Sequence, residues 1–126
     1  MNAGSRLTFV RGIALVIYLV AGMSSVGQAA ELVMFRQALC EWCEVWDDEV
    51  GVVYNKTQEG RLVPIRQIDI HDQRPDDLRS IRPVVFTPTF VLVDDGKEIG
   101  RIQGYPGEDF FWGLLNQMLG RMPAEG

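Results

Sequence analysis

The two cysteines of this 126-residue chain, Cys40 and Cys43, most strongly constrain its fold and chemistry. An apolar run at residues 32–35 precedes them, and a helical pattern over residues 43–54 follows. Cysteines at positions i and i+3 at the start of a helix lie on one face, close enough to form a disulfide. The partial positive charge of a helix N-terminus favours the thiolate of the first cysteine. We predict a redox-active pair in which Cys40 attacks a disulfide and Cys43 resolves the mixed disulfide.

Two other interpretations of this pair stay open. A structural disulfide across so short a loop would remove little entropy from the unfolded chain, so it would stabilise the fold weakly. A zinc site would need two further ligands, and the chain offers one histidine, His71, and no other cysteine. The position between a strand and a helix favours redox chemistry, which needs no metal and no other cofactor.

Residues 1–29 have the layout of a secretory signal peptide. Two arginines, Arg6 and Arg11, precede a short apolar run at residues 13–21. Mostly small residues follow this run at residues 24–30. The alternative is an uncleaved membrane anchor, but the apolar run is shorter than the roughly 20 residues of a spanning helix. We therefore expect export to the periplasm and one domain over residues 30–126.

The charge of that domain argues against nucleic-acid binding. All 17 Asp and Glu residues follow the predicted signal peptide, whereas two of the 12 Lys and Arg residues lie within it. The remaining domain is thus more acidic than the whole chain, whose net charge is −5. Nucleic-acid binding needs a basic face, so that class of partner is excluded.

Strands and helices alternate along the domain and predict an α/β fold. Strands are expected at residues 32–36, 62–70 (regular after Pro64), 89–93 and 98–103, and helices at residues 40–54, 75–80 and 108–119. Residues 56–60 are expected as a loop ending at Gly60, and residues 94–97 as a hairpin turn. The order βαβαββα predicts a four-stranded mixed sheet flanked by helices, with the first two strands parallel.

The aromatic and apolar residues of the helices divide into core and surface candidates. Trp46 and Trp112 have apolar neighbours at helical spacing and are expected in the core. The last helix should bury five apolar residues, namely Phe110, Phe111, Leu114, Leu115 and Met118. Trp42 lies between the cysteines, and we expect it to face a partner; partial burial against the preceding loop is the alternative.

The domain resembles the thioredoxin-like family over nearly its whole length. Cys40 matches the family's exposed attacking cysteine and Cys43 its buried resolving cysteine. Thr87 and Pro88 match its cis-proline loop, whose backbone pairs with a bound substrate as an added strand. An ordinary trans proline at the start of a strand is the alternative. The resemblance implies a minimal thioredoxin-like fold and substrate contacts from Trp42, Thr87 and Pro88.

Within this family, the sequence is similar to the SoxS-type periplasmic thioredoxins of bacterial sulfur-oxidation clusters. The segments at residues 86–96 and 100–112, together with the signal peptide, carry this similarity. It implies a monomeric thiol-disulfide reductase without a cofactor. Such a reductase takes electrons from a membrane thiol transporter and keeps the cysteine of a sulfur-carrier protein active.

Four residues depart from thioredoxins proper and leave open how Cys43 exchanges its proton. Glu41 and Trp42 replace the Gly-Pro pair between the cysteines, Met34 replaces a buried aspartate, and Gln67 replaces its lysine. The nearest carboxylates are those of Glu41 and Glu44.

The direction of electron flow is a further open point. The negative charge of Glu41 disfavours a neighbouring thiolate, so it favours a reductase over an oxidase. The competing interpretations are a disulfide donor or isomerase of protein folding, and a binding module whose cysteines are only structural.

Three charged or titratable features of the domain have simpler interpretations. The acidic residues of the active-site helix are expected to be a solvated face, although such a face would steer a basic partner. His71 is expected to be ordinary surface. Arg36 is a candidate to offset the acidic charge.

Overall fold

The computed structural model of the protein describes residue 27 and residues 29–124. Most of the predicted signal peptide therefore lies outside the described residues, and its cleavage stays a prediction. Four strands form one sheet: β1 (Glu31–Arg36), β2 (Ile65–Asp69), β3 (Thr89–Asp94) and β4 (Lys97–Gln103). Their order is β2-β1-β3-β4, with β1 and β2 parallel and the other pairs antiparallel. This arrangement confirms the predicted four-stranded mixed sheet.

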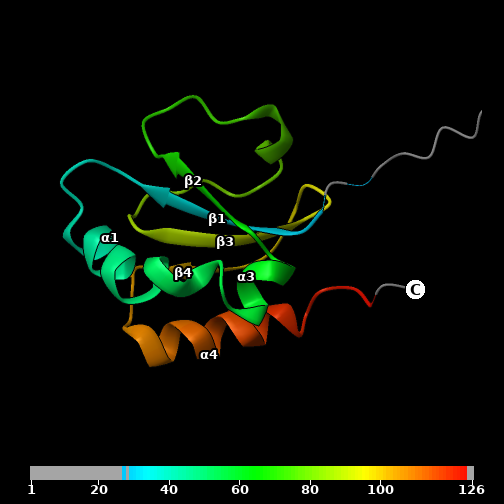
Figure 1. Cartoon of the computed structure of the whole chain (residues 1–126). Helices are drawn as coiled ribbons and strands as arrows, with labels where there is room; N and C mark the ends of the chain where they lie inside the picture. The colour runs from blue at the N-terminus through cyan, green and yellow to red at the C-terminus, as the bar shows by residue number, and fades with distance from the viewer. Residues whose placement is uncertain (1–26, 28, 125–126) are drawn as a thin grey trace, which may run out of the picture.

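The helices gather on one face of the sheet (Figure 1). A continuous helical stretch comprises α1 (Glu41–Trp46), a π-helical segment (Asp47–Gly51) and α2 (Val52–Tyr54). Two further helices, α3 (Gln58–Leu62) and α4 (Glu108–Leu119), complete this layer. The long connection from β2 to β3, residues 70–88, covers the opposite face (Figure 1). Within residue 27 and residues 29–124, no helix is long and apolar enough to cross a membrane.

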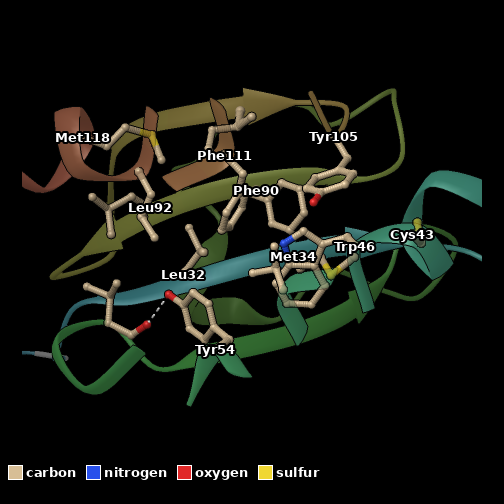
Figure 2. Packing of buried hydrophobic residues seen from close by; sticks show 14 of the residues in the cluster. Leu32, Met34, Cys43, Trp46, Tyr54, Phe90, Leu92, Tyr105, Phe111 and Met118 are labelled. Atoms are coloured by element: carbon tan, nitrogen blue, oxygen red, sulfur yellow. Dashed lines mark hydrogen bonds between the residues drawn. The ribbon is translucent and has the colours of Figure 1, made fainter. Parts of the chain in front are cut away.

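The alternation of side chains along β1 explains why both faces are covered. Leu32 and Met34 point into the cluster under the helices, whereas Val33 and Phe35 belong to a second cluster on the opposite face. All four are at most 3% exposed. A strand that is apolar on both sides needs a layer on each face, which is the reason for the three-layer arrangement. Figure 2 shows the helix-side cluster, with Met34 beside Trp46 and with Cys43 at one edge.

The predicted hairpin turn between β3 and β4 is confirmed. Asp95 and Gly96 both have positive φ, at 51° and 74°. Such a pair matches the right-handed twist of the strands, and Asp-Gly is a favoured sequence for it.

The predicted loop at residues 56–60 is wrong, because α3 begins there. Thr57 caps this helix: its side-chain oxygen accepts a hydrogen bond from the N–H of Gly60 at 3.0 Å. Gly60 is not a helix stop. A Cβ atom at this position would lie 1.9 Å from the carbonyl oxygen of Tyr54, so glycine is needed for a close backbone approach. As a result β2 begins only at Ile65, after Pro64.

Two helix predictions also need correction. Residues 75–80 hold only a 3₁₀ turn, Asp76–Leu78, in place of a short helix. On α4, Phe110 is 72% exposed and Leu114 is 37% exposed, although both were expected in the core. The sequence offers α4 two adjacent apolar stripes, and only the stripe that contains Phe111, Leu115 and Met118 packs against the sheet. Trp46 is buried as predicted, whereas Trp112 is half-buried and stacks on Tyr54.

Candidate functional site

Cys40 and Cys43 form a disulfide at the start of α1, with a Cα–Cα distance of 5.2 Å. Cys40 is the N-cap residue of α1 and has an extended backbone. Its sulfur accepts a hydrogen bond from the N–H of Cys43 at 3.2 Å. This bond satisfies one of the backbone N–H groups in the first turn of the helix that have no intrahelical partner. Cys40 is 8% exposed and Cys43 is fully buried. Solvent and substrate therefore reach the pair through Cys40.

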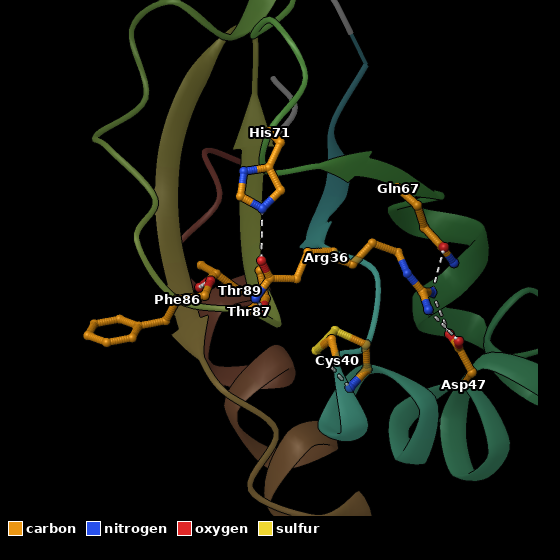
Figure 3. Close-up of a disulfide and its surroundings, with 10 residues drawn as sticks. Arg36, Cys40, Asp47, Gln67, His71, Phe86, Thr87 and Thr89 are labelled. Carbon is orange, nitrogen blue, oxygen red and sulfur yellow. Dashed lines mark hydrogen bonds and ion pairs between the residues drawn. A yellow bond between two sulfur atoms is a disulfide. The ribbon is translucent and has the colours of Figure 1, made fainter.

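Exposed apolar side chains lie next to the disulfide and next to Thr87 in the sequence. Leu39, directly before Cys40, is fully exposed and has a φ of 61°. Trp42, between the cysteines, is 56% exposed, and its contact with a partner stays a prediction. Phe86, directly before Thr87, is 60% exposed, and Figure 3 shows its ring pointing away from the protein. Leu39 and Phe86 were not singled out from the sequence, because an isolated apolar loop residue gives no signal of its exposure.

The peptide bond between Thr87 and Pro88 is cis, as the family resemblance implied. Pro88 is buried and Thr87 is half-buried. The first residue pair of the β3–β4 ladder is Thr89 with Gln103, so Thr87 lies just outside the paired part of the sheet. Its side-chain oxygen accepts a hydrogen bond from Nε2 of Gln37 at 2.9 Å. Gln37, which also lines a pocket with Cys40, thus connects the disulfide side of the site to the proline loop.

The positions that hold the aspartate and lysine in thioredoxins proper contain no acid–base pair here. Met34 is fully buried and cannot carry a proton. Among the described residues, Thr89 is the one buried polar side chain, so no buried carboxylate lies beneath the disulfide. Glu41 and Glu44 are exposed to solvent. The proton that leaves Cys43 during reaction therefore has no buried carboxylate acceptor.

Arg36 forms a cluster of side-chain hydrogen bonds with Asp47 and with Gln67, the residue that replaces the lysine of thioredoxins proper (Figure 3). The guanidinium of Arg36 donates two hydrogen bonds to the carboxylate of Asp47, at 2.9 and 2.8 Å, and one to Oε1 of Gln67 at 2.8 Å. The hydrogen bond to Asp47 raises the pKa of Arg36. Arg36 thus offsets one acid of the active-site helix, as expected, and Gln67 supports it.

A pocket of about 390 Å³ lies between the Arg36 cluster and Cys40. Its lining comes from the loop before the disulfide, from α1 and from the end of β2. The lining residues are Arg36, Gln37, Ala38, Leu39, Cys40, Glu44, Gln67, Ile68 and Asp69. Within residues 29–124, no three His, Cys, Asp or Glu side chains are grouped so that they could hold a metal ion.

His71 is exposed, but it is not the isolated surface residue that the sequence suggested. Its Nε2 lies 3.0 Å from Oε1 of Gln37. Its backbone N–H donates to the carboxylate of Asp69 at 2.8 Å, which fixes the turn after β2. Sequence spacing could not reveal this contact, because His71 and Gln37 are 34 residues apart.

Comparison with known families adds to this geometry. A family model described as a thioredoxin-like domain matches residues 26–119. A search of curated proteins finds no match.

Solved structures give a more specific similarity. The periplasmic thioredoxin SoxS from Paracoccus pantotrophus, in its reduced form, is 46% identical and superposes with a TM-score of 0.71. The match covers 73% of this chain and 97% of that one. Thioredoxin from Fasciola hepatica is 23% identical with a TM-score of 0.55, covering 71% of this chain and 81% of that one. Thioredoxin from Malassezia sympodialis is 21% identical with a TM-score of 0.54, covering 73% and 76%. The last two similarities support the fold alone.

Proposed function

The chain belongs to the thioredoxin-like family and is a thiol-disulfide oxidoreductase similar to SoxS, and from that premise we propose that it is a periplasmic reductase. Its substrate would be a cysteine of a partner protein of the sulfur-carrier type, which the enzyme returns to its active thiol form. The observation that carries the proposal is the disulfide itself, which Cys40 presents to solvent beside exposed apolar side chains.

In the proposed reaction the dithiol form of the enzyme supplies two electrons. The Cys40 thiolate attacks the partner's disulfide, forms a mixed disulfide and releases the first partner thiol. Cys43 then loses its proton and attacks the sulfur of Cys40, which releases the second thiol and closes the Cys40–Cys43 bond. Trp42 and the backbone of Thr87, next to Pro88, would hold the partner during these steps.

The charge around Cys40 favours the direction of a reductase. From Gln37 to Asn55 the chain contains no Lys or Arg. The guanidinium of Arg36, which lines a pocket together with Cys40, is bonded to Asp47. Glu41 stands exposed between the cysteines. With little positive charge to stabilise the Cys40 thiolate, the reduced form is less favoured, and such a dithiol donates electrons more readily.

Two further parts of the proposal concern the setting. The similarity to a periplasmic thioredoxin and the predicted signal peptide (residues 1–29) support export, with residues 30–126 as the working domain. In an oxidising compartment a reductase needs an electron source, which we propose is a membrane thiol transporter. We also propose that the enzyme works as a monomer and needs no cofactor beyond its cysteine pair.

The equilibrium reduction potential of the Cys40–Cys43 pair, measured against glutathione, tests the direction. A value near or below about −270 mV supports the reductase. A value near −120 mV would instead identify a disulfide donor of protein folding. Glu41→Gln is the matched variant: if the charge of Glu41 sets the direction, its removal should raise the potential by about 10–30 mV, which corresponds to at most about one unit of thiol pKa.

Trapping experiments test the roles of the two cysteines. Cys43→Ser should accumulate covalent complexes with partner proteins, because the mixed disulfide on Cys40 can no longer be resolved. Cys40→Ser should trap no partner and should lose all activity. If both variants bind partners as well as the wild type does, the chain is a binding module with a structural disulfide.

A further inference from the structure

Two side chains that the proposed reaction does not use connect three separate segments next to the disulfide. Nε2 of Gln37 donates to the side-chain oxygen of Thr87 at 2.9 Å, and Oε1 of Gln37 lies 3.0 Å from Nε2 of His71. Because the amide of Gln37 uses its N–H on Thr87, its oxygen is left to accept, so His71 donates from Nε2. Figure 3 shows His71 and Thr87 on the same side of Cys40.

The hydrogen bonds of Gln37 to Thr87 and His71 form a link between three residues, and these residues are held to the sheet very differently. Gln37 directly follows β1, whose last residue, Arg36, accepts a backbone hydrogen bond from Ile70 at 2.8 Å. His71 follows β2 and is fixed by Asp69. Both therefore stand on the end of the parallel strand pair. His71 lies at the start of the long connection between β2 and β3, whereas Thr87 lies near its other end.

That connection is loosely covered just before Thr87. Val85 is 69% exposed and Phe86 is 60% exposed, so neither side chain anchors the backbone by burial. The side chain of Arg101 bonds to the carbonyl of Pro83 at 3.0 Å, and Thr89 bonds to the carbonyl of Phe86 at 2.7 Å. Gln37 supplies the bond that reaches Thr87 from outside the connection.

We propose that Gln37, oriented by His71, is a positioning residue that holds Thr87 ready to pair with the backbone of a protein substrate. This inference rests on the proposed function, since it assumes that a polypeptide binds at Thr87. A preformed edge loses less conformational freedom when a substrate strand is added, so the link increases affinity without taking part in electron transfer.

The test is a single-turnover stopped-flow experiment in which the pre-reduced protein reacts with one of two substrates. Both substrates release the same coloured thiolate when they are attacked. One is a nine-residue extended peptide whose central cysteine is disulfide-bonded to 5-thio-2-nitrobenzoate. The other is 5,5′-dithiobis(2-nitrobenzoate), which has no peptide backbone. In both reactions the Cys40–Cys43 dithiol is oxidised and one substrate disulfide is reduced to two thiols.

Gln37→Leu removes the link while keeping a side chain of similar size. We expect the half-saturating concentration of the peptide to rise about 3- to 10-fold, the effect of losing one neutral hydrogen bond. The limiting rate and the reaction with the small disulfide should be unchanged. The carboxylate of Gln37→Glu can still accept from Nε2 of His71, and it can accept from the hydroxyl of Thr87, which then donates in place of accepting. This variant should therefore restore peptide affinity to within about 2-fold. Gln117→Leu, on the exposed side of α4, is the matched control and should change nothing.

A double-mutant cycle separates positioning from general destabilisation. Thr87→Val removes the acceptor of the link, so Gln37→Leu should add no further loss in the Thr87→Val background. His71→Leu should act in the same direction as Gln37→Leu but more weakly, about 2-fold. An unchanged value for His71→Leu would remove His71 from the proposal.

The outcomes also separate this inference from the proposed function. If the wild type does not react with the peptide, the proposed function fails. If the wild type reacts and Gln37→Leu leaves the half-saturating concentration unchanged, the positioning role is overturned. The same holds if Gln37→Leu slows both substrates equally, because a structural defect at the cysteines would do that.

Discussion

The two faces of the sheet are stabilised in different ways. On the helix side, a large cluster surrounds the buried indole of Trp46, which lies 5.3 Å from Phe90 and 5.9 Å from Phe111 between ring centroids. Cys43 belongs to this cluster. On the other side the cluster holds six buried residues, and all of them are aliphatic except Phe35: Val33, Phe35, Leu78, Ile81, Val91 and Val93.

Arginine side chains hold the cover of the thinner face in place. Arg66 bridges Glu31 and Asp77, both at 2.8 Å, and so ties the connection at residues 70–88 to the sheet. Arg74 donates to the carbonyl of Ile81 at 3.0 Å. The carboxylate of Glu98, on β4, accepts hydrogen bonds from the guanidinium groups of both Arg82 and Arg101. The cluster on this side has fewer buried residues than the cluster under the helices, so hydrogen bonds and ion pairs contribute a larger part of its stability.

The comparison matters because the two halves of the site rest on different faces. The disulfide is anchored in the aromatic cluster, whereas Thr87 lies on the connection that the arginines hold. We therefore expect packing changes to disturb the cysteine pair first, and expect acid or salt to disturb the proline loop first.

The largest effect is expected from Trp46→Ala. It removes the central side chain of the aromatic cluster and should lower the free energy of unfolding by about 3–5 kcal/mol. Trp46→Phe should cost far less, because the indole nitrogen is buried without a hydrogen-bond partner among the described residues. Denaturant titration of the oxidised protein measures both. Equal losses for the two variants would contradict the central packing role of the ring.

Leu78→Ala tests the thinner face. Leu78, the last residue of the 3₁₀ turn, is fully buried, and its truncation should cost about 2–3 kcal/mol, the lower part of the usual range. Amide hydrogen exchange should rise most in residues 70–88 and least around α1. Uniform faster exchange across the whole chain would show that the two faces unfold as one unit.

Glu98→Gln tests the ion pairs. Burial by itself raises the pKa of Glu98, but hydrogen bonds from Arg101 and Arg82 outweigh it and lower the pKa from 4.5 to about 2. A lowered pKa means that this group stabilises the fold above about pH 4.5 and loses that contribution as the pH falls towards 2.

At neutral pH, Glu98→Gln should cost about 2 kcal/mol, because the guanidinium of Arg101 is left without its carboxylate. The variant should also lose stability less steeply than the wild type between about pH 4.5 and 2, as measured by thermal unfolding at each pH. Parallel stability curves for the two proteins would contradict this account. Asp76→Asn, from a surface pair in which both side chains are at least 75% exposed, is the matched control and should have little effect.

The smallest effect is expected from Phe110→Ser on the outer face of α4. Although Phe110 belongs to an apolar stripe, it is 72% exposed, so the substitution should change the free energy of unfolding by less than about 0.5 kcal/mol. Phe111→Ser, one residue away and fully buried, provides the contrast and should be severely destabilising. A loss above 1 kcal/mol for Phe110→Ser would show that this face is covered in solution.

Local patterns in the sequence were enough to predict much of this protein. Two cysteines three positions apart, placed between a strand and a helix, indicated the disulfide. The alternation of elements indicated the mixed sheet, and Asp95 and Gly96 indicated the hairpin turn. These features depend on neighbours in the chain, so periodicity and turn chemistry report them directly.

The tertiary structure decided the rest. Gly60 looked like a helix stop because its close contact with the backbone of Tyr54 exists only after folding. Phe110 looked like core because the sequence cannot say which of two adjacent stripes on α4 meets the sheet. The bonds between Gln37 and Thr87 and between Arg36 and Asp47 join residues 50 and 11 positions apart. Side-chain contacts across such separations depend on how the strands and helices are placed in space, and no local pattern encodes that placement.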